Sequence, residues 1–196
     1  ADSEYCAKFI TDGAVELYHN NAKKIETTAT GVTVTGNVNG LAITTTADDN
    51  IGLGLTALDS ITTGDQNVGL GSYTLTANTS GSTNTGIGYS SLYTNSTGSG
   101  NTAVGKGSLF ANTTGSWNIA LGYNALDANT TGTYNVALGT SSLTTATTAA
   151  HNTAVGADAL GLTTTGANNT GIGSAALYAN TTGAENTAVG KGSLDS

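Results

Sequence analysis

Residues 118–134 read NIALGYNALDANTTGTY, and this 17-residue pattern recurs without a slip from Asn50 onward. Position 1 of the repeat is always asparagine, position 5 is always glycine and position 9 is always leucine. Three consecutive central units supply these ladder residues: Asn101, Gly105, Leu109, Asn118, Gly122, Leu126, Asn135, Gly139 and Leu143. A fixed short period of this kind predicts an architecture in which each unit stacks on the next.

The length and the pattern of the unit indicate β-structure. A helix–turn–helix repeat takes more than about 30 residues, whereas this unit has 17. Residues 101–105 alternate like a short strand, and residues 108–111 read as a second extended segment, although a helical turn would also fit. We therefore expect an all-β fold, a β-solenoid of the parallel β-roll type over residues 50–196, with eight full coils and a partial ninth.

Residues 1–49 differ from the repeats because they carry more charge and alternate with a period of two. Residues 14–18 and 23–27 predict the two strands of a hairpin, and further strands are predicted at 31–35 and 41–44. Repeat arrays need terminal units that cover the exposed first coil. We therefore expect a small N-terminal β module that acts as an adaptor or cap.

The packing of each coil can be predicted from the repeat. The aliphatic residue at position 4, such as Val104, and the leucine at position 9 are expected to point into the coil. The alanine or glycine at position 3, such as Ala103, would then face outward, where small side chains allow another chain to approach closely. Because the core of one coil is thin, we expect a homotrimer that packs through this Ala/Gly wall. The asparagine at position 1 is expected to form a ladder between coils.

Composition excludes several classes of partner. The formal net charge is −8, with five lysines and no arginine, which argues against nucleic acid and against an anionic membrane surface. No apolar run approaches the roughly 18 residues of a membrane-spanning helix. The single cysteine, Cys6, is expected to be a small buried residue, with an interchain bridge as the alternative. The chain has no methionine and stops within a repeat, which we expect of a piece of a longer polypeptide.

The sequence contains no pattern that predicts catalysis, a cofactor or a metal site. Asp59, Asp127 and Asp195 share position 10 but lie four coils apart, about 19 Å at a rung spacing of about 4.8 Å. Paired catalytic carboxylates of glycosidases lie roughly 5–10 Å apart. His19 and His151 are alone in their regions, and the repeated glycines neither precede a lysine of a phosphate-binding loop nor begin a helix. We therefore expect a protein that is not an enzyme.

Two kinds of surface residue could bind a ligand. Adjacent Thr/Ser pairs at positions 13 and 14, such as Thr113-Thr114, could form an ice-binding array, but we expect them to satisfy a turn and neighbouring coils. Aromatic residues at variable positions could stack on a host surface glycan or serve ordinary packing. The candidates for glycan contact are Tyr89, Tyr93, Trp117, Tyr123 and Tyr134.

The repeat resembles those of two groups of surface proteins. Asn-Thr-Ala-Val-Gly at 101–105, 152–156 and 186–190 resembles the repeat of trimeric autotransporter adhesin heads, which are trimers of left-handed parallel β-rolls. The longer pattern at 118–132 looks like repeats of phage tail-fibre proteins and bacterial surface proteins. The segment 12–36 is similar to one common in tail fibres of marine and cyanobacterial phages. The period of 17 is longer than that of the usual adhesin-head repeat.

The resemblance implies a function in attachment structures. It implies a rigid segment of a phage tail fibre or trimeric surface adhesin, located in a virion or at a cell surface, with a repeat region about 40 Å long. Its implied partners are two further copies of the chain and a host surface glycan. The alternative from the residues themselves is a monomeric glycan- or ice-binding β-solenoid. A third hypothesis, a polysaccharide depolymerase, has no supporting group of residues.

Overall fold

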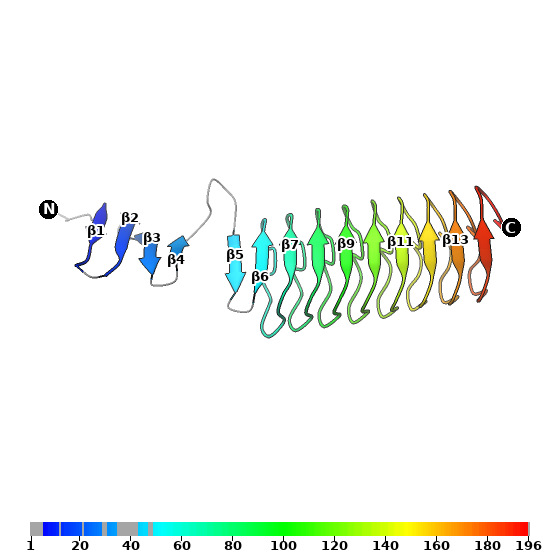
Figure 1. The fold of residues 1–196 in the computed structure, drawn as a ribbon, viewed down its shortest axis with the longest axis horizontal. Coiled ribbons are helices and arrows are strands. Elements are labelled where there is room, and N and C mark those ends of the chain that lie inside the picture. The colour runs from blue at the N-terminus through cyan, green and yellow to red at the C-terminus, as the bar shows by residue number, and fades with distance from the viewer. Residues whose placement is uncertain are drawn as a thin grey trace. The chain divides into compact units, whose positions relative to one another are not determined.

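The computed structural model describes residues 6–11, 13–20, 22–28, 31–34, 43–46 and 49–195. Within these residues the chain forms only strands and turns, without a helix. It divides into two units, Ala1–Ala42 and Ile43–Ser196, and each is shown in Figure 1. The predicted all-β class and the solenoid of 17-residue coils are confirmed.

The N-terminal unit is a four-stranded antiparallel sheet. Its strands, in spatial order, are β1 (Ala7–Phe9), β2 (Val15–His19), β3 (Ala22–Thr28) and β4 (Gly31–Val34). Strands β2 and β3 form the predicted hairpin, and Asn20 at its turn has a φ of 50°. Asparagine tolerates this left-handed conformation better than most residues do, which explains why the hairpin turns here.

A polar network joins β2 to β3. The buried Glu16 carboxylate accepts hydrogen bonds from the Tyr18 hydroxyl at 2.7 Å and from Lys23 Nζ at 2.9 Å. Lys23 also forms an ion pair with Glu26 at 2.9 Å. The hydrogen bond from Tyr18, followed by that from Lys23, lowers the pKa of Glu16. The hydrogen bonds to Glu16 and Glu26 raise the pKa of Lys23.

The second unit is built on one ten-stranded sheet in which the strands follow one another in chain order. They are β5 (Ile43–Thr46), β6 (Asn50–Leu53), β7 (Val68–Leu70), β8 (Thr85–Ile87), β9 (Thr102–Val104), β10 (Ile119–Leu121), β11 (Val136–Leu138), β12 (Thr153–Val155), β13 (Thr170–Ile172) and β14 (Thr187–Val189). From β6 to β14 all pairs are parallel, and each residue pairs with its equivalents 17 residues away, as Ala120 does with Ala103 and Ala137. Each coil of the solenoid therefore adds one rung to the sheet.

Strand β5 closes the start of the solenoid. It runs antiparallel to β6, with Thr46 opposite Asn50, and belongs to the second unit. A strand laid along the first rung satisfies the edge that would otherwise be free to pair with another chain. The boundary between the units thus falls before Ile43, whereas the change in composition had placed it at residue 50.

Each described coil contains one strand, at positions 2–4, and the rest of the coil is turns. The predicted second extended segment at 108–111 is wrong, because these residues form a turn in which Leu109 has a φ of 50°. This left-handed conformation redirects the backbone while keeping it bonded to the next coil, since the Leu109 N–H donates to the Ala125 carbonyl at 3.0 Å. The gain of an intercoil hydrogen bond offsets the steric cost of a left-handed leucine.

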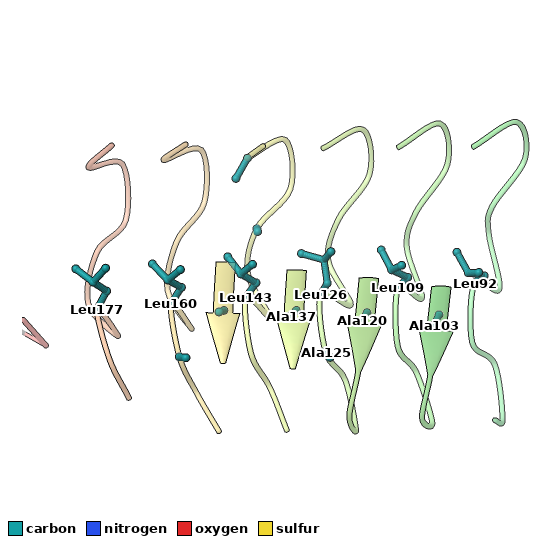
Figure 2. Packing of buried hydrophobic residues seen from close by; sticks show 14 of the residues in the cluster. Leu92, Ala103, Leu109, Ala120, Ala125, Leu126, Ala137, Leu143, Leu160 and Leu177 are labelled. Atoms are coloured by element: carbon teal, nitrogen blue, oxygen red, sulfur yellow. The ribbon is translucent and has the colours of Figure 1, made fainter. Parts of the chain in front are cut away.

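The prediction of which residues fill the core was half right. The position 9 leucines are buried, as predicted, but position 3 also points inward and position 4 points outward. Ala120 is fully buried whereas Leu121 is 39% exposed. Figure 2 shows a column of leucines, including Leu109 and Leu126, beside the strand alanines. The core of a coil is narrow, so the leucine side chain leaves room for only alanine or glycine on the facing strand.

Asparagine ladders fill the remaining interior. Asn118 donates from Nδ2 to Asn101 Oδ1 at 3.1 Å and to the Gly132 carbonyl at 2.9 Å, and its Oδ1 accepts from the Asn135 N–H at 3.0 Å. The predicted ladder at position 1 is thereby confirmed. A second ladder runs through position 12, where Asn112 Nδ2 donates to the preceding coil's Asn95 Oδ1 at 2.7 Å. Both ladders satisfy buried amides and fix the spacing of the coils.

Glycine is invariant at position 5, where successive coils approach closely. Gly105 has a φ of 131°, and a β-carbon on it would collide with the carbonyl of Gly122 in the next coil. Any other residue would be strained both by its own backbone conformation and by this contact.

Candidate interaction surfaces

The side chains at positions 2 and 4 of β6–β14 form one surface, which we call the outer sheet face. It contains only isoleucine, valine, leucine and threonine. From β6 to β14 its pairs are Ile51 and Leu53, Val68 and Leu70, Thr85 and Ile87, Thr102 and Val104, Ile119 and Leu121, Val136 and Leu138, Thr153 and Val155, Thr170 and Ile172, and Thr187 and Val189. The face is therefore an uncharged and largely apolar surface that follows the solenoid from its first rung to its last.

The outer sheet face is comparable in area to the largest apolar patch of a typical soluble monomer. Ile119 and Leu121 in the middle of the sheet are 40% and 39% exposed. At a rung spacing of about 4.8 Å and a rise of about 3.3 Å per residue, the face measures about 40 Å by 10 Å. Contiguous apolar patches of roughly 300–600 Å² on soluble proteins are often functional. The face falls within this range.

Aromatic residues and a lysine form a second surface next to the sheet, at position 6. Lys106 Nζ lies 5.9 Å from the ring centroids of both Tyr89 and Tyr123, which belong to the coils before and after it. Position 10 forms a parallel row, in which Tyr93 and Phe110 stack with their centroids 5.2 Å apart and their planes at 8°. Positions 6 and 10 lie on either side of the turn that carries the left-handed residues.

A groove of about 260 Å³ lies between these two rows, and we call it the Lys106 groove. Its lining is Tyr89, Ser90, Lys106, Gly107, Phe110, Asn124 and Asp127. Residues from three successive coils therefore meet in one open depression. Of the residues predicted to contact a glycan, Tyr89 lies in the groove, Tyr123 flanks Lys106 and Tyr93 stacks on the wall residue Phe110.

The other two predicted glycan contacts lie elsewhere on the coil. Trp117 and Tyr134 occupy position 17, which precedes the strand, whereas position 6 follows it. The indole of Trp117 lies over Gly100, at the place where a β-carbon would collide with it. Tyr134 stacks on His151, with centroids 5.0 Å apart and planes at 12°. The structure therefore places Tyr89, Tyr93 and Tyr123 after the strands, at positions 6 and 10, and Trp117 and Tyr134 before them, at position 17.

Sequence reasoning missed the five non-aromatic lining residues of the groove: Ser90, Lys106, Gly107, Asn124 and Asp127. Each occupies a variable repeat position and carries no motif of its own. The available signal was their spacing, because Lys106 lies 17 residues from both Tyr89 and Tyr123. A register of 17 brings such residues side by side on neighbouring coils.

In most coils the hydroxyl at position 13, the first of each pair, bonds to the next coil, as predicted. At position 13, Thr113 Oγ1 donates to the Thr130 carbonyl and Thr130 Oγ1 donates to the Thr147 carbonyl, both at 3.0 Å. These hydroxyls therefore tie each coil to the next. The pairs do not form a strand face of the kind that binds ice.

No group of three or more His, Cys, Asp or Glu side chains that could hold a metal ion occurs among the described residues. Cys6 is exposed, so the prediction that it is a buried apolar residue is wrong. The strand that follows it, β1, lies at the edge of the N-terminal sheet. No helix long and apolar enough to cross a membrane is found in the described ranges.

Comparisons of the chain with protein-family models, with curated proteins and with solved structures gave no match. The resemblance to adhesin-head and tail-fibre repeats thus depends on the motifs alone. The outer sheet face and the Lys106 groove are the candidate functional surfaces of the chain.

Proposed function

We propose that this chain is a rigid fibre segment, of the phage tail-fibre or trimeric surface-adhesin kind, that packs side by side with two further copies of itself. The observation that supports the proposal is the uncharged outer sheet face, which remains exposed along the whole solenoid in a single chain. Its location would be a virion or a cell surface, and its task would be to hold an attachment site at a fixed distance.

The internal bonding of the solenoid suits a rigid spacer. Successive coils are joined by the parallel sheet, by the position 1 asparagine ladder and by hydrogen bonds between their turns. Bending the solenoid would separate successive coils on its convex side and stretch the bonds that join them there. A repeat array in which every unit contacts only its neighbours also gains length without changing its cross-section.

The outer sheet face fits a second copy of the chain better than an unrelated partner. A copy has the same spacing between rungs, so its isoleucine, valine and leucine rows can interdigitate along the full length. With a net charge of −8 on each chain, contact through an uncharged face also avoids bringing like charges together. The adhesin-head repeats that the motif resembles are trimers, and we therefore propose three copies. The sequence predicted that copies would meet through the Ala/Gly wall at position 3. That wall instead packs against leucines of the same chain, so we propose contact through the outer sheet face.

Sedimentation velocity and negative-stain electron microscopy of the whole chain test the proposal. We expect a mass of about 58 kDa, three times that of the 19.3 kDa chain, and thin unbranched rods. Replacing Leu121 and Leu138 by lysine should give a folded monomer, since two charges per chain cannot be buried in an apolar contact. Thr131→Lys, at an exposed loop position, is the matched control and should stay trimeric. A monomeric or dimeric native chain would contradict the proposal.

A monomeric ice-binding module is the second candidate. The outer sheet face is regular, and five of its position 2 residues are threonines: Thr85, Thr102, Thr153, Thr170 and Thr187. Such rows of hydroxyl and methyl groups at constant spacing could order water. A native monomer that shows thermal hysteresis would favour this function over the fibre.

A further inference from the structure

We propose that the Lys106 groove binds a pyranose unit of a neutral glycan. The inference deepens the proposed function, on which it rests for its biological setting, because it assigns a ligand-binding site to the shaft itself.

The groove is not required by the scaffold. The tetrapeptide Lys106-Gly107-Ser108-Leu109 recurs as Lys191-Gly192-Ser193-Leu194 in the last coil. Lys106 has a tyrosine at the same position in both neighbouring coils, whereas the coil before Lys191 has Ser174 there. The solenoid therefore forms the same turn without aromatic neighbours. Of the eight aromatic residues of the repeats, four lie in the groove or beside it: Tyr89, Tyr93, Phe110 and Tyr123.

The aromatic walls are suited to the apolar face of a sugar ring. Tyr89 on one side is 53% exposed and Phe110 on the other is 40% exposed. Phe110 is held in place by stacking on Tyr93, so its ring presents a preorganised flat surface. Aromatic rings pack favourably against the C–H groups of a pyranose, and rigid aromatic contacts lose little conformational entropy on binding.

The polar lining supplies hydrogen bonds of both kinds. Lys106 offers ammonium donors, and its position near Tyr89 and Tyr123 keeps the ammonium group at the rim. Asp127 uses Oδ1 to accept from Thr144 Oγ1 at 2.7 Å, which leaves Oδ2 as an acceptor. Asn124 can donate and accept at once. Neighbouring hydroxyls of a pyranose are themselves donors and acceptors, so this set can bind two of them.

Gly107 is part of the lining of the groove. It has a φ of 70°, and a β-carbon there would collide with Asn124 Oδ1. The side-chain amide of Asn124 therefore lies across the glycine, and this placement brings it into the groove. Gly107 follows a lysine at position 6, and both neighbouring coils have a tyrosine at position 6. Among the described coils this combination occurs here alone.

The size and charge of the groove select the ligand class. Its 260 Å³ lies just below the roughly 300–1,000 Å³ typical of small-molecule sites, which suits one sugar ring. The groove is open, so an internal unit of a longer glycan can enter. Asp127 and the net charge of −8 disfavour a carboxylated sugar. We therefore expect the ligand to be a neutral glycan.

Saturation-transfer NMR and calorimetry on the whole chain test the site. The probes are linear oligosaccharides of glucose, mannose, galactose and N-acetylglucosamine at millimolar concentration, with oligogalacturonate as the acidic comparison. We expect at least one neutral series to bind and the galacturonate not to bind. Phe110→Ala and Lys106→Ala should each weaken binding by about tenfold or more.

Matched controls come from the same repeat positions in other coils. Tyr178 shares position 10 with Phe110 and is 38% exposed, and Lys191 shares position 6 with Lys106. Tyr178→Ala and Lys191→Ala should leave the affinity unchanged within about twofold. Circular dichroism of all four variants checks that each remains folded.

Three results would overturn the inference: no binding by any neutral probe, preference for the galacturonate, or equal loss in the control variants. Sedimentation of the same samples tests the fibre proposal independently of glycan binding. A trimeric rod that binds no probe would remove the sugar site and leave the fibre. A monomer that binds a neutral glycan through Phe110 would remove the fibre proposal and leave the sugar site.

Discussion

Ala146 lies one coil after Asn129 at the same repeat position, and it ends the second asparagine ladder. Asn129 Nδ2 donates to Asn112 Oδ1 at 2.8 Å, but no described residue donates to its own buried Oδ1. In the next coil Thr163 also replaces asparagine, and its Oγ1 donates onward to the Asn180 carbonyl at 2.8 Å. The solenoid thus contains an internal gap in a ladder that is continuous before it.

Restoring the ladder should stabilise the solenoid. Ala146→Asn places a donor next to Asn129 Oδ1 but leaves its own Oδ1 without a partner, so we expect a change within about 1 kcal/mol. Adding Thr163→Asn continues the ladder to Asn180, and the double variant should gain about 2 kcal/mol. Hydrogen-exchange protection of the amides in residues 129–180 measures the effect. Strictly additive single and double variants would contradict the ladder explanation.

The stacking of the coils could be predicted from the sequence, because a strict period of 17 leaves one register. The asparagine ladder could be predicted for the same reason. The inward face of the strand could not, since Ala120 between Ile119 and Leu121 alternates equally well in either orientation. The choice depends on the width of the coil. The leucine at position 9 crosses that width and leaves space for only alanine or glycine.

The turn was missed because its conformation is unusual. Leu109 adopts a positive φ, which is rare for leucine, so the sequence indicated extended backbone. This turn places positions 6 and 10 on either side of the Lys106 groove. The groove therefore could not be predicted, although Tyr89 and Tyr123 were recognised as candidates. The ladder at position 12 had a signal, since asparagine recurs there in five of the eight full coils.

The inner and outer faces of the strand should respond to substitution in opposite ways. Ala120→Leu adds three carbons to a fully buried site that packs in the leucine column, and we expect it to cost about 1–3 kcal/mol. Leu121→Ala removes a half-exposed side chain and should leave a single chain folded while weakening association. Thermal unfolding followed by circular dichroism, together with sedimentation, separates the two effects. If Leu121→Ala proved the more damaging to the fold of the monomer, the assignment of the two faces would be wrong.

Removing one rung of the first ladder should open the solenoid locally. Asn118→Ala deletes the donor to Asn101 Oδ1 and Gly132, and it leaves the Asn135 N–H without its acceptor. With several buried polar groups unsatisfied, we expect a loss of about 3–5 kcal/mol. Exchange of the amides in β10 and β11 reports this loss directly. Thr131→Ala, on the exposed loop, is the control, and the idea fails if both variants exchange alike.

The N-terminal sheet should lose stability in acid. The pKa of Glu16 is lowered from its ordinary value of 4.5 by the hydrogen bonds from Tyr18 and Lys23. Its contribution is therefore present above pH 4.5 and is lost as the pH falls through the lowered value. The raised pKa of Lys23 matters at alkaline pH. The stability that Lys23 contributes is lost only as the pH rises above the ordinary pKa of 10.5. The network is complete between these limits.

Protection factors of the β2 and β3 amides, measured from neutral pH down to about pH 3, test this dependence. They should fall in the native chain and change little in Glu16→Gln, which carries no titrating group at that position. Glu26→Gln removes one partner of Lys23 but retains the hydrogen bond between Tyr18 and Glu16, so the dependence should persist. An unchanged acid response in Glu16→Gln would show that another group controls the stability of the sheet.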